Sequence, residues 1–158
     1  MEPAIRGLVL DSSVLVAAER AKLTTPDVLR NIRAMTVAEL AHGIYRADSP
    51  ERRQRRRQFV DELKAHIPVH PVTEAAAEII ARIGGEQAAK GINLPVIDLI
   101  IGAGALELGY AIGTDNTRDF NQIPDLKVIS PPGKRYGTST PGWCRHSVLP
   151  AIFSSPRL

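Results

Sequence analysis

The feature that most restricts the fold of this chain is the alternation of short apolar runs with longer segments of helical periodicity. The apolar runs at residues 8–10, 67–69, 110–114 and 127–129 have the length and composition of short strands. Strands that alternate with helices pair in parallel, because each connection returns the chain to the same edge of the sheet. We therefore predict an α/β fold, a three-layer α/β/α sandwich with a short, mainly parallel central sheet.

Capping residues and glycines delimit the helices. Thr36, Ser49 and Thr73 have the character of N-caps, and Gly109 is placed to end a helix. Thr25, with Pro26 after it, has the pattern of another helix start. A glycine pair at residues 84–85 is expected to weaken or end the helix in which it lies. The predicted helices cover residues 14–20, 27–33, 36–45, 50–66, 74–83 and 96–108.

The composition changes near residue 131. The whole chain has 158 residues, the usual size of one domain. Its last 28 residues hold five of the twelve prolines and the only tryptophan, and they have no clear periodicity. We predict one domain at residues 1–133 and an irregular or disordered tail at residues 134–158.

Several classes of protein are excluded by composition. The single cysteine allows neither an internal disulfide nor a zinc site built from cysteines. The N-terminus lacks the pattern of a secretory signal. The most apolar region, residues 94–112, is interrupted by Asp98 and Glu107, so it is expected to be buried core and not a membrane span. A soluble cytoplasmic protein is the resulting expectation.

Four carboxylates are brought towards one edge of the sheet by this topology. Asp11 and Asp115 each follow a predicted strand, while Glu39 and Asp98 lie in the first turns of predicted helices. Ligands in open parallel sheets bind beyond the carboxyl ends of the strands, where the following helices also begin. Asp119 lies within reach of the same loop. The sequence therefore predicts a cluster of acidic side chains at that edge.

Each acid also has an ordinary structural interpretation. Glu39 could complete a capping box with Thr36, and Asp98 could cap a helix that begins at the next residue. Asp11 and Asp115 could be turn formers. One observation opposes these structural interpretations. Asp98 interrupts an apolar run, where a carboxylate needs a partner or a cation.

Clustered carboxylates repel one another unless a cation lies between them. Oxygen ligands without cysteine or histidine suit a hard ion, Mg²⁺ or Mn²⁺. Such an ion can activate water and neutralise charge on a phosphodiester. The acidic cluster thus indicates metal-dependent phosphoryl chemistry without selecting a substrate.

Four segments contain the candidate acids: LVLDSS at residues 8–13, TVAELAHGI at residues 36–44, DLIIGA at residues 98–103 and TDNTRDF at residues 114–120. In this order they resemble the PIN-domain ribonucleases and in particular the VapC-like toxins of type II toxin–antitoxin systems. The likeness covers residues 5–130.

The resemblance implies site residues. It assigns the first three acids to Asp11, Glu39 and Asp98, with Asp11 and Asp98 as metal ligands. The fourth acid is either Asp115 or Asp119, because the position where some relatives carry it is Asn116. We favour Asp115, also as a metal ligand, and keep Asp119 and Asn116 as supporting or alternate residues. The resemblance adds two hydroxyl groups that support the site, those of Ser13 and Thr114.

The resemblance also implies an activity and partners. These are hydrolysis of single-stranded RNA with Mg²⁺ or Mn²⁺, dimerisation, and inhibition by a cognate antitoxin. In that family a β-rich stretch precedes the helix that bears the second acid. Here the helical pattern of residues 27–33 leaves room for a very short strand or none.

Basic residues offer phosphate contacts. The net charge is +3, and five arginines lie within residues 52–57. They span nearly two helical turns, so most are expected to be solvated surface, with phosphate tracking as the alternative. Arg118, inside the acidic loop, is a more local candidate. His42 follows Glu39 by three residues and either faces the same groove or is structural.

Two functions follow from these features. The first is a metal-dependent endoribonuclease that acts as the toxin of a toxin–antitoxin pair. The alternative is a catalytically weakened PIN-fold module that binds RNA or protein, motivated by Asn116 and by the altered segment before Thr36. Binding of a divalent ion would separate the two.

Overall fold

Strands and helices alternate along most of the chain. The computed structural model describes residues 6–20 and 31–130. Its elements are β1 (Leu8–Leu10), α1 (Ser12–Arg20), β2 (Ile32–Arg33), α2 (Ala34–Tyr45), α3 (Pro50–His66), β3 (Val69–His70), α4 (Glu74–Ala89), α5 (Val96–Leu108), β4 (Ala111–Gly113), α6 (Thr117–Phe120) and β5 (Val128–Ile129). The tail predicted at residues 134–158 lies outside the described residues.

All the described strand pairs are parallel, as the sequence predicts. β4 lies between β1 and β5, with Val9 opposite Ile112. β2 and β3 form a second parallel ladder, and a single bridge between Val9 and Asn31 links it to β1. The strands are only two or three residues long, so the helices supply most of the buried surface.

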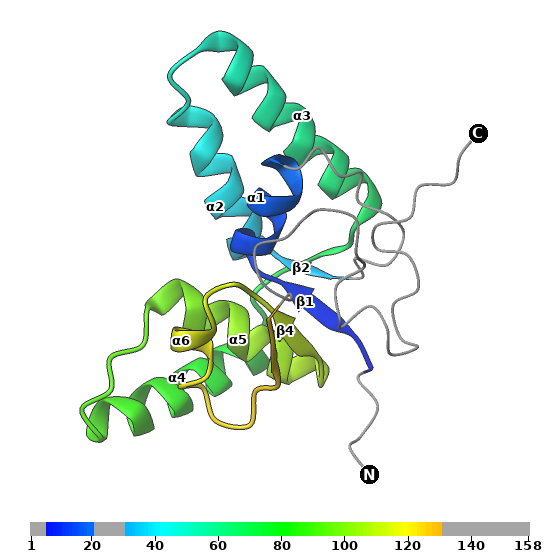
Figure 1. Cartoon of the computed structure of the whole chain (residues 1–158). Coiled ribbons are helices and arrows are strands. Elements are labelled where there is room, and N and C mark those ends of the chain that lie inside the picture. Colours follow the sequence, from blue (N-terminus) through cyan, green and yellow to red (C-terminus); the bar gives the residue numbers. More distant parts are fainter. Residues whose placement is uncertain (1–5, 21–30, 131–158) are drawn as a thin grey trace.

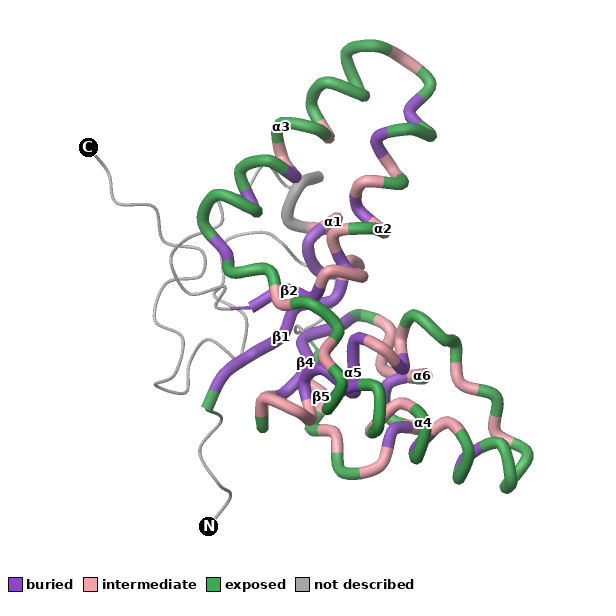
Figure 2. The backbone as a smooth tube through the Cα atoms, turned by 180° about the vertical axis from the view of Figure 1, so that it is seen from behind, coloured by how far each residue is buried: buried purple, intermediate pink, exposed green. Residues whose placement is uncertain are grey.

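Two hydrophobic clusters lie on opposite faces of β1. Leu8 and Leu10 pack with apolar residues of α1, α2 and α3, while Val9 packs with residues of α4, α5 and α6. Alternate residues of a strand face opposite sides of the sheet, so a strand covered on both faces is apolar throughout. The two groups of helices lie on opposite sides of the strands in Figure 1, and Figure 2 shows β1 and β4 buried between them. The predicted three-layer arrangement is confirmed.

The helix α5 has the bounds that the sequence predicts. It ends at Gly109, whose φ of 66° lies in the left-handed region that glycine adopts most easily. Its middle turns are buried in the core, as residues 99 and 101–105 show. None of the described helices combines the length and the apolarity needed to cross a membrane.

The segment before Glu39 differs from the prediction. Residues 31–33 are extended and not helical: Ile32 pairs with Val69, and Arg33 pairs with His70. Residues 27–30 of the predicted helix, and its predicted start at residues 25–26, lie outside the described part of the chain. The strand before the second acid is therefore present and very short, because pairing with β3 overrides the local helical preference.

Two helix boundaries also differ. α2 begins at Ala34, so Thr36 is a buried residue of its first turn and not the N-cap. α4 continues through the glycine pair to Ala89. Gly84 allows α4 to approach α5 closely, since a Cβ there would lie 3.2 Å from the Leu99 side chain. The predicted caps Ser49 and Thr73 are confirmed, each accepting a backbone N–H at the start of its helix.

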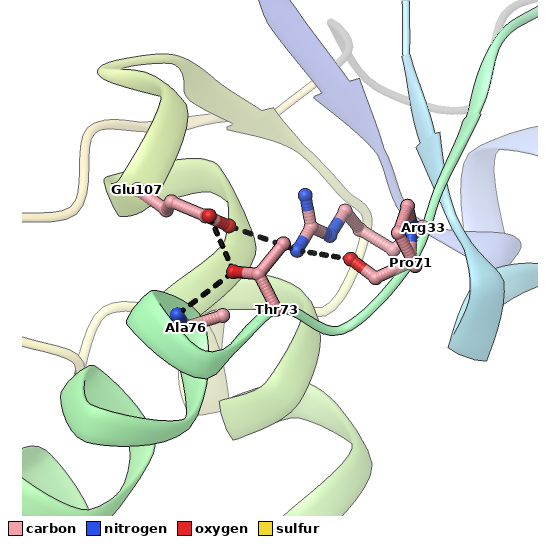
Figure 3. A network of polar contacts seen from close by, with 5 residues as sticks. All are labelled: Arg33, Pro71, Thr73, Ala76 and Glu107. Atoms are coloured by element: carbon pink, nitrogen blue, oxygen red, sulfur yellow. Dashed lines mark hydrogen bonds and ion pairs between the residues drawn. The ribbon is translucent and has the colours of Figure 1, made fainter.

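A buried polar network joins Arg33 of β2 to α5 and to the start of α4 (Figure 3). The side chain of Arg33 is 1% exposed and forms an ion pair with Glu107 of α5 at 3.2 Å. It also donates a hydrogen bond to the carbonyl oxygen of Pro71 at 3.0 Å. Thr73 donates to the second oxygen of Glu107 and accepts from the Ala76 amide at 3.0 Å. The network fixes the start of α2 relative to α5.

Candidate functional site

Four acidic side chains from distant parts of the chain act on one another at the carboxyl edge of the sheet. Asp11 follows β1, Glu39 lies on α2, Asp98 lies in the first turn of α5, and Asp119 lies in α6. The charges of the other three all raise the pKa of Asp98. Such mutual effects require proximity, so the convergence that topology predicts for Asp11, Glu39 and Asp98 is present.

Asp11 is held by two hydroxyl groups. It is 4% exposed, and its Oδ2 accepts hydrogen bonds from Ser13 Oγ and Thr114 Oγ1, both at 2.8 Å. Ser13 belongs to the first turn of α1 and Thr114 follows β4, so the bonds join the ends of the two central strands. These hydrogen bonds fix the position of the Asp11 carboxylate. Ser13 and Thr114 thus contact the residue that the sequence expects them to support.

Asn116 lies between two carboxylates. Its Nδ2 donates to Asp98 Oδ2 and to Asp119 Oδ2, both at 3.0 Å. Its backbone N–H donates to Thr114 Oγ1 at 2.9 Å, which ties this loop to the group around Asp11. The amide is neutral, so it separates the two carboxylates without compensating their charge.

Glu39 is partly enclosed. Burial is the main cause of the raised pKa of its carboxyl, and the charge of Asp11 adds to the effect. The Ser12 hydroxyl forms a hydrogen bond with the side chain and partly offsets the shift. The other carboxylate oxygen, Oε2, is buried and has no hydrogen-bond partner. A buried oxygen without a partner is costly, and a cation or a bound water would satisfy it.

Among the described acids, Asp98 has the most strongly raised pKa. Burial raises its pKa from an ordinary 3.8 to about 6, and the charges of Asp11, Asp119 and Glu39 contribute in that order. The hydrogen bond from Asn116 acts in the opposite direction. A carboxyl placed among three others in a partly buried position is one that a cation would stabilise strongly.

The capping interpretations of the two helix acids are wrong. Thr36 lies inside α2, and its buried Oγ1 has no hydrogen-bond partner, so it forms no capping box with Glu39. Asp98 is the third residue of α5, and the N-cap position belongs to Pro95. Both acids therefore sit in the cluster without a capping role.

The two candidates for the fourth acid occupy different surroundings. Asp119 shares the Asn116 amide with Asp98 and raises its pKa. Asp115 is exposed, and its backbone N–H donates to Ser13 Oγ at 3.1 Å. The geometry places the Asp119 carboxylate beside Asp98 and gives Asp115 a backbone contact. Arg118, the predicted phosphate contact, is exposed at the same loop.

The donor set fits a hard divalent cation. All four side chains offer carboxylate oxygens, Asp98 carries a raised pKa, and Glu39 has a buried oxygen without a partner. Within residues 6–20 and 31–130, no three acidic, histidine or cysteine side chains already stand close enough to share one ion. The amide of Asn116 occupies the space between Asp98 and Asp119, so binding would require local rearrangement of these side chains.

One contact of the site was not predicted from the sequence. The side chain of Ser12 lowers the pKa of Glu39. Two hydroxyl residues directly follow Asp11 in the sequence, and the resemblance implies a supporting role only for the second, Ser13.

Comparisons with known proteins agree with this fold. The model of the PIN domain family matches residues 8–126. Ribonuclease VapC of Rickettsia bellii is 32% identical over 132 residues, which cover 81% of this chain and 98% of that protein.

Two solved structures have the same fold. A toxin–antitoxin complex, VapBC-5 from Mycobacterium tuberculosis, is 27% identical with a TM-score of 0.63, covering 78% of this chain and 96% of that one. The DNA-bound VapBC of Salmonella typhimurium has a TM-score of 0.70 at 21% identity, covering 78% and 97%. The match to the family model extends from β1, just before Asp11, to beyond Asp119, so it includes the whole acidic cluster. This chain belongs to the PIN-domain family.

Proposed function

We propose that this protein is a divalent-metal-dependent endoribonuclease that acts as the toxin of a toxin–antitoxin pair. The single observation that carries the proposal is the convergence of Asp11, Glu39, Asp98 and Asp119 at one edge of the sheet. The chain is also related, over 81% of its own length and 98% of the relative's, to a protein named ribonuclease VapC. The proposed partners are RNA as substrate, a cognate antitoxin and a second copy of this chain, all in the cytoplasm.

The carboxylates have distinct proposed roles. Asp11 and Asp98 would hold Mg²⁺ or Mn²⁺, with Asp119 as the third ligand. When bound, the ion supplies charge neutralisation at the phosphate and lowers the pKa of water. Ser13 and Thr114 hold Asp11 in position through the two 2.8 Å bonds. Asn116 positions Asp98 and Asp119 relative to each other.

Glu39 is the proposed proton acceptor. Its raised pKa brings it closer to neutral pH, where a general base is most effective. In the proposed reaction the oxygen of a water forms a bond to phosphorus and the bond from phosphorus to O3′ breaks. Glu39 takes a proton from the water, and the departing O3′ takes up a proton. The products carry a 5′-phosphate and a 3′-hydroxyl.

The first test is cleavage of single-stranded RNA by the purified protein. We expect cleavage with Mg²⁺ or Mn²⁺, products that carry 5′-phosphates, and no cleavage in EDTA. We also expect Mn²⁺ to raise the melting temperature, because the ion binds the folded carboxylate cluster. If the protein shows no cleavage and Mn²⁺ does not stabilise it, a module that has lost catalysis is favoured instead.

The choice between the two candidates for the fourth acid gives a second prediction. Asp119→Asn is expected to lower the cleavage rate by at least about 10-fold, since even residues that only support metal ligands cost about 10- to 100-fold. The Asp115→Asn variant loses the same charge from the same loop, but its carboxylate is exposed. We expect it to retain activity within about threefold of the unmodified protein. A larger loss for Asp115→Asn than for Asp119→Asn would reassign the role to Asp115.

A further inference from the structure

We infer that one face of the α2–α3 hairpin binds the backbone of the single-stranded RNA beside the cleaved bond. This face, the α2 strip, consists of His42 of α2, Arg46 directly after α2, and Arg56 of α3. The inference rests on the proposed function, because it extends the same site. It assigns a binding role to residues outside the acidic cluster.

The helical spacing places the strip next to Glu39. His42, Gly43 and Arg46 follow Glu39 by three, four and seven residues, so all four share one face of α2. Seven residues of an α-helix span about 10 Å. The strip therefore begins at a carboxylate of the candidate active site and continues away from it. His42 and Arg46 are both exposed, so neither is buried in the core as a structural residue.

Arg56 adds a second positive charge to the strip from the neighbouring helix. Its Nη1 donates to the carbonyl oxygen of Gly43 at 2.5 Å. A Cβ added at Gly43 would be in ordinary contact with this nitrogen, at 3.7 Å. The guanidinium of Arg56 therefore lies next to Gly43. The hydrogen bond fixes a cation between His42 and Arg46 along the helix. A guanidinium has five donors, which leaves others for a phosphate.

Other arginines of the cluster have different partners. Arg52 forms an ion pair with Asp48 at 2.8 Å. The guanidinium of Arg57 lies 5.8 Å from the centre of the Tyr45 ring. Tyr45 is six residues from Glu39, which places it about 120° away around the helix. Within the described residues Arg46 forms no ion pair, so its charge is available to a ligand.

The chemistry of the strip matches a phosphate backbone. It offers cations and no aromatic ring, so it fits sequence-independent contacts and not base stacking. Negative carboxylates at one end would repel an anion unless a divalent ion is bound there. A strand whose cleaved phosphate lies at the acidic cluster can continue past Glu39 along α2, where the strip begins. This continuity with the acidic cluster favours RNA over an acidic protein segment.

The test compares Arg46→Gln with Arg57→Gln. Both variants lose one arginine charge from the same hairpin, and only Arg46 belongs to the strip. Both substitutions are introduced into Glu39→Gln protein, which the proposed mechanism makes inactive and which serves as the reference. Binding of a fluorescent single-stranded RNA is measured by anisotropy in Mg²⁺, over a series of salt concentrations. One lost phosphate contact is expected to weaken binding about fivefold at ~0.1 M salt and to reduce the salt slope by about 0.7. We expect Arg57→Gln to bind within twofold of the reference.

Three results would overturn the inference. They are equal losses in both variants, no loss for Arg46→Gln, or a loss of antitoxin binding with unchanged RNA binding. The last result would assign the strip to an acidic segment of the antitoxin. Cleavage assays separate this inference from the proposed function. If the unmodified protein cleaves RNA and Arg46→Gln has an unchanged KM, the RNA-binding role of the strip is wrong and the nuclease assignment remains.

Discussion

Replacing Asp98 with Asn is expected to reduce RNA cleavage by at least about 100-fold and to make the metal-free protein more stable. Loss of activity follows from removing a proposed metal ligand, since even residues that support ligands cost 10- to 100-fold. The gain in stability has a separate cause. The Asp98 carboxyl is partly buried among three other acids, and its ionised form is therefore unfavourable.

The pH dependence gives the sign of this stability effect. The folded pKa of Asp98 is about 6 against 3.8 ordinarily, so the folded state holds its proton to higher pH than the unfolded chain. Stability of the metal-free protein therefore falls as the pH rises from about 4 through 6. The full shift corresponds to about 3 kcal/mol, which solvent screening reduces to about 1–2 kcal/mol. Asparagine cannot ionise, so the variant lacks this loss.

The measurement is thermal unfolding in EDTA at pH 4 and pH 7. At pH 7 we expect the Asp98→Asn variant to melt about 3–6 °C higher than the unmodified protein, with a much smaller difference at pH 4. Addition of Mn²⁺ should stabilise the unmodified protein more than the variant. The control is Asp61→Asn on the exposed surface of α3, where the same charge change should have little effect on either quantity. Lower stability of Asp98→Asn at pH 7 would contradict the proposed electrostatics.

The acidic cluster was largely predictable because its members follow strands or begin helices. Asp11 follows β1, Asp98 lies in the first turn of α5, and parallel pairing brings these positions to one edge. The sequence favours Asp115 over Asp119, whereas the structure places the carboxylate of Asp119, in α6, beside Asp98. That difference depends on the direction of each side chain, which the Asn116 amide and the turn of α6 determine.

The errors in the fold have a common cause in contacts between distant segments. Residues 31–33 have a helical pattern, but Ile32 is completely buried and pairs with Val69. The glycine pair at residues 84–85 would end an isolated helix, but packing of α4 on α5 stabilises its continuation. Local preference is a weak signal where tertiary contacts compensate it. Arg33 is a further case, because the sequence gives no sign that this arginine is buried.

Gly104→Ala is expected to destabilise the protein by about 2–3 kcal/mol, although alanine is the better helix former. Gly104 lies in α5 directly beside the buried Arg33 side chain. A Cβ at Gly104 would lie 2.2 Å from Arg33 Nε and 2.4 Å from Cζ. The guanidinium cannot move aside without losing Glu107 and the Pro71 carbonyl. Overpacking costs about 1–3 kcal/mol, and breaking a buried ion pair costs about 3–5 kcal/mol where no relaxation occurs.

A matched substitution in the neighbouring helix has the opposite expected sign. Gly85 lies inside α4, is exposed, and has no atom within 4 Å of the Cβ that alanine would add. Gly85→Ala should therefore stabilise the protein by about 0.5–1 kcal/mol through helix preference alone. Thermal unfolding of the two variants should show melting temperatures displaced in opposite directions, by about 6–9 °C downward for Gly104→Ala. If both variants were stabilised, Arg33 could not be packed against α5 as described, and its link between α2 and α5 would have to be abandoned.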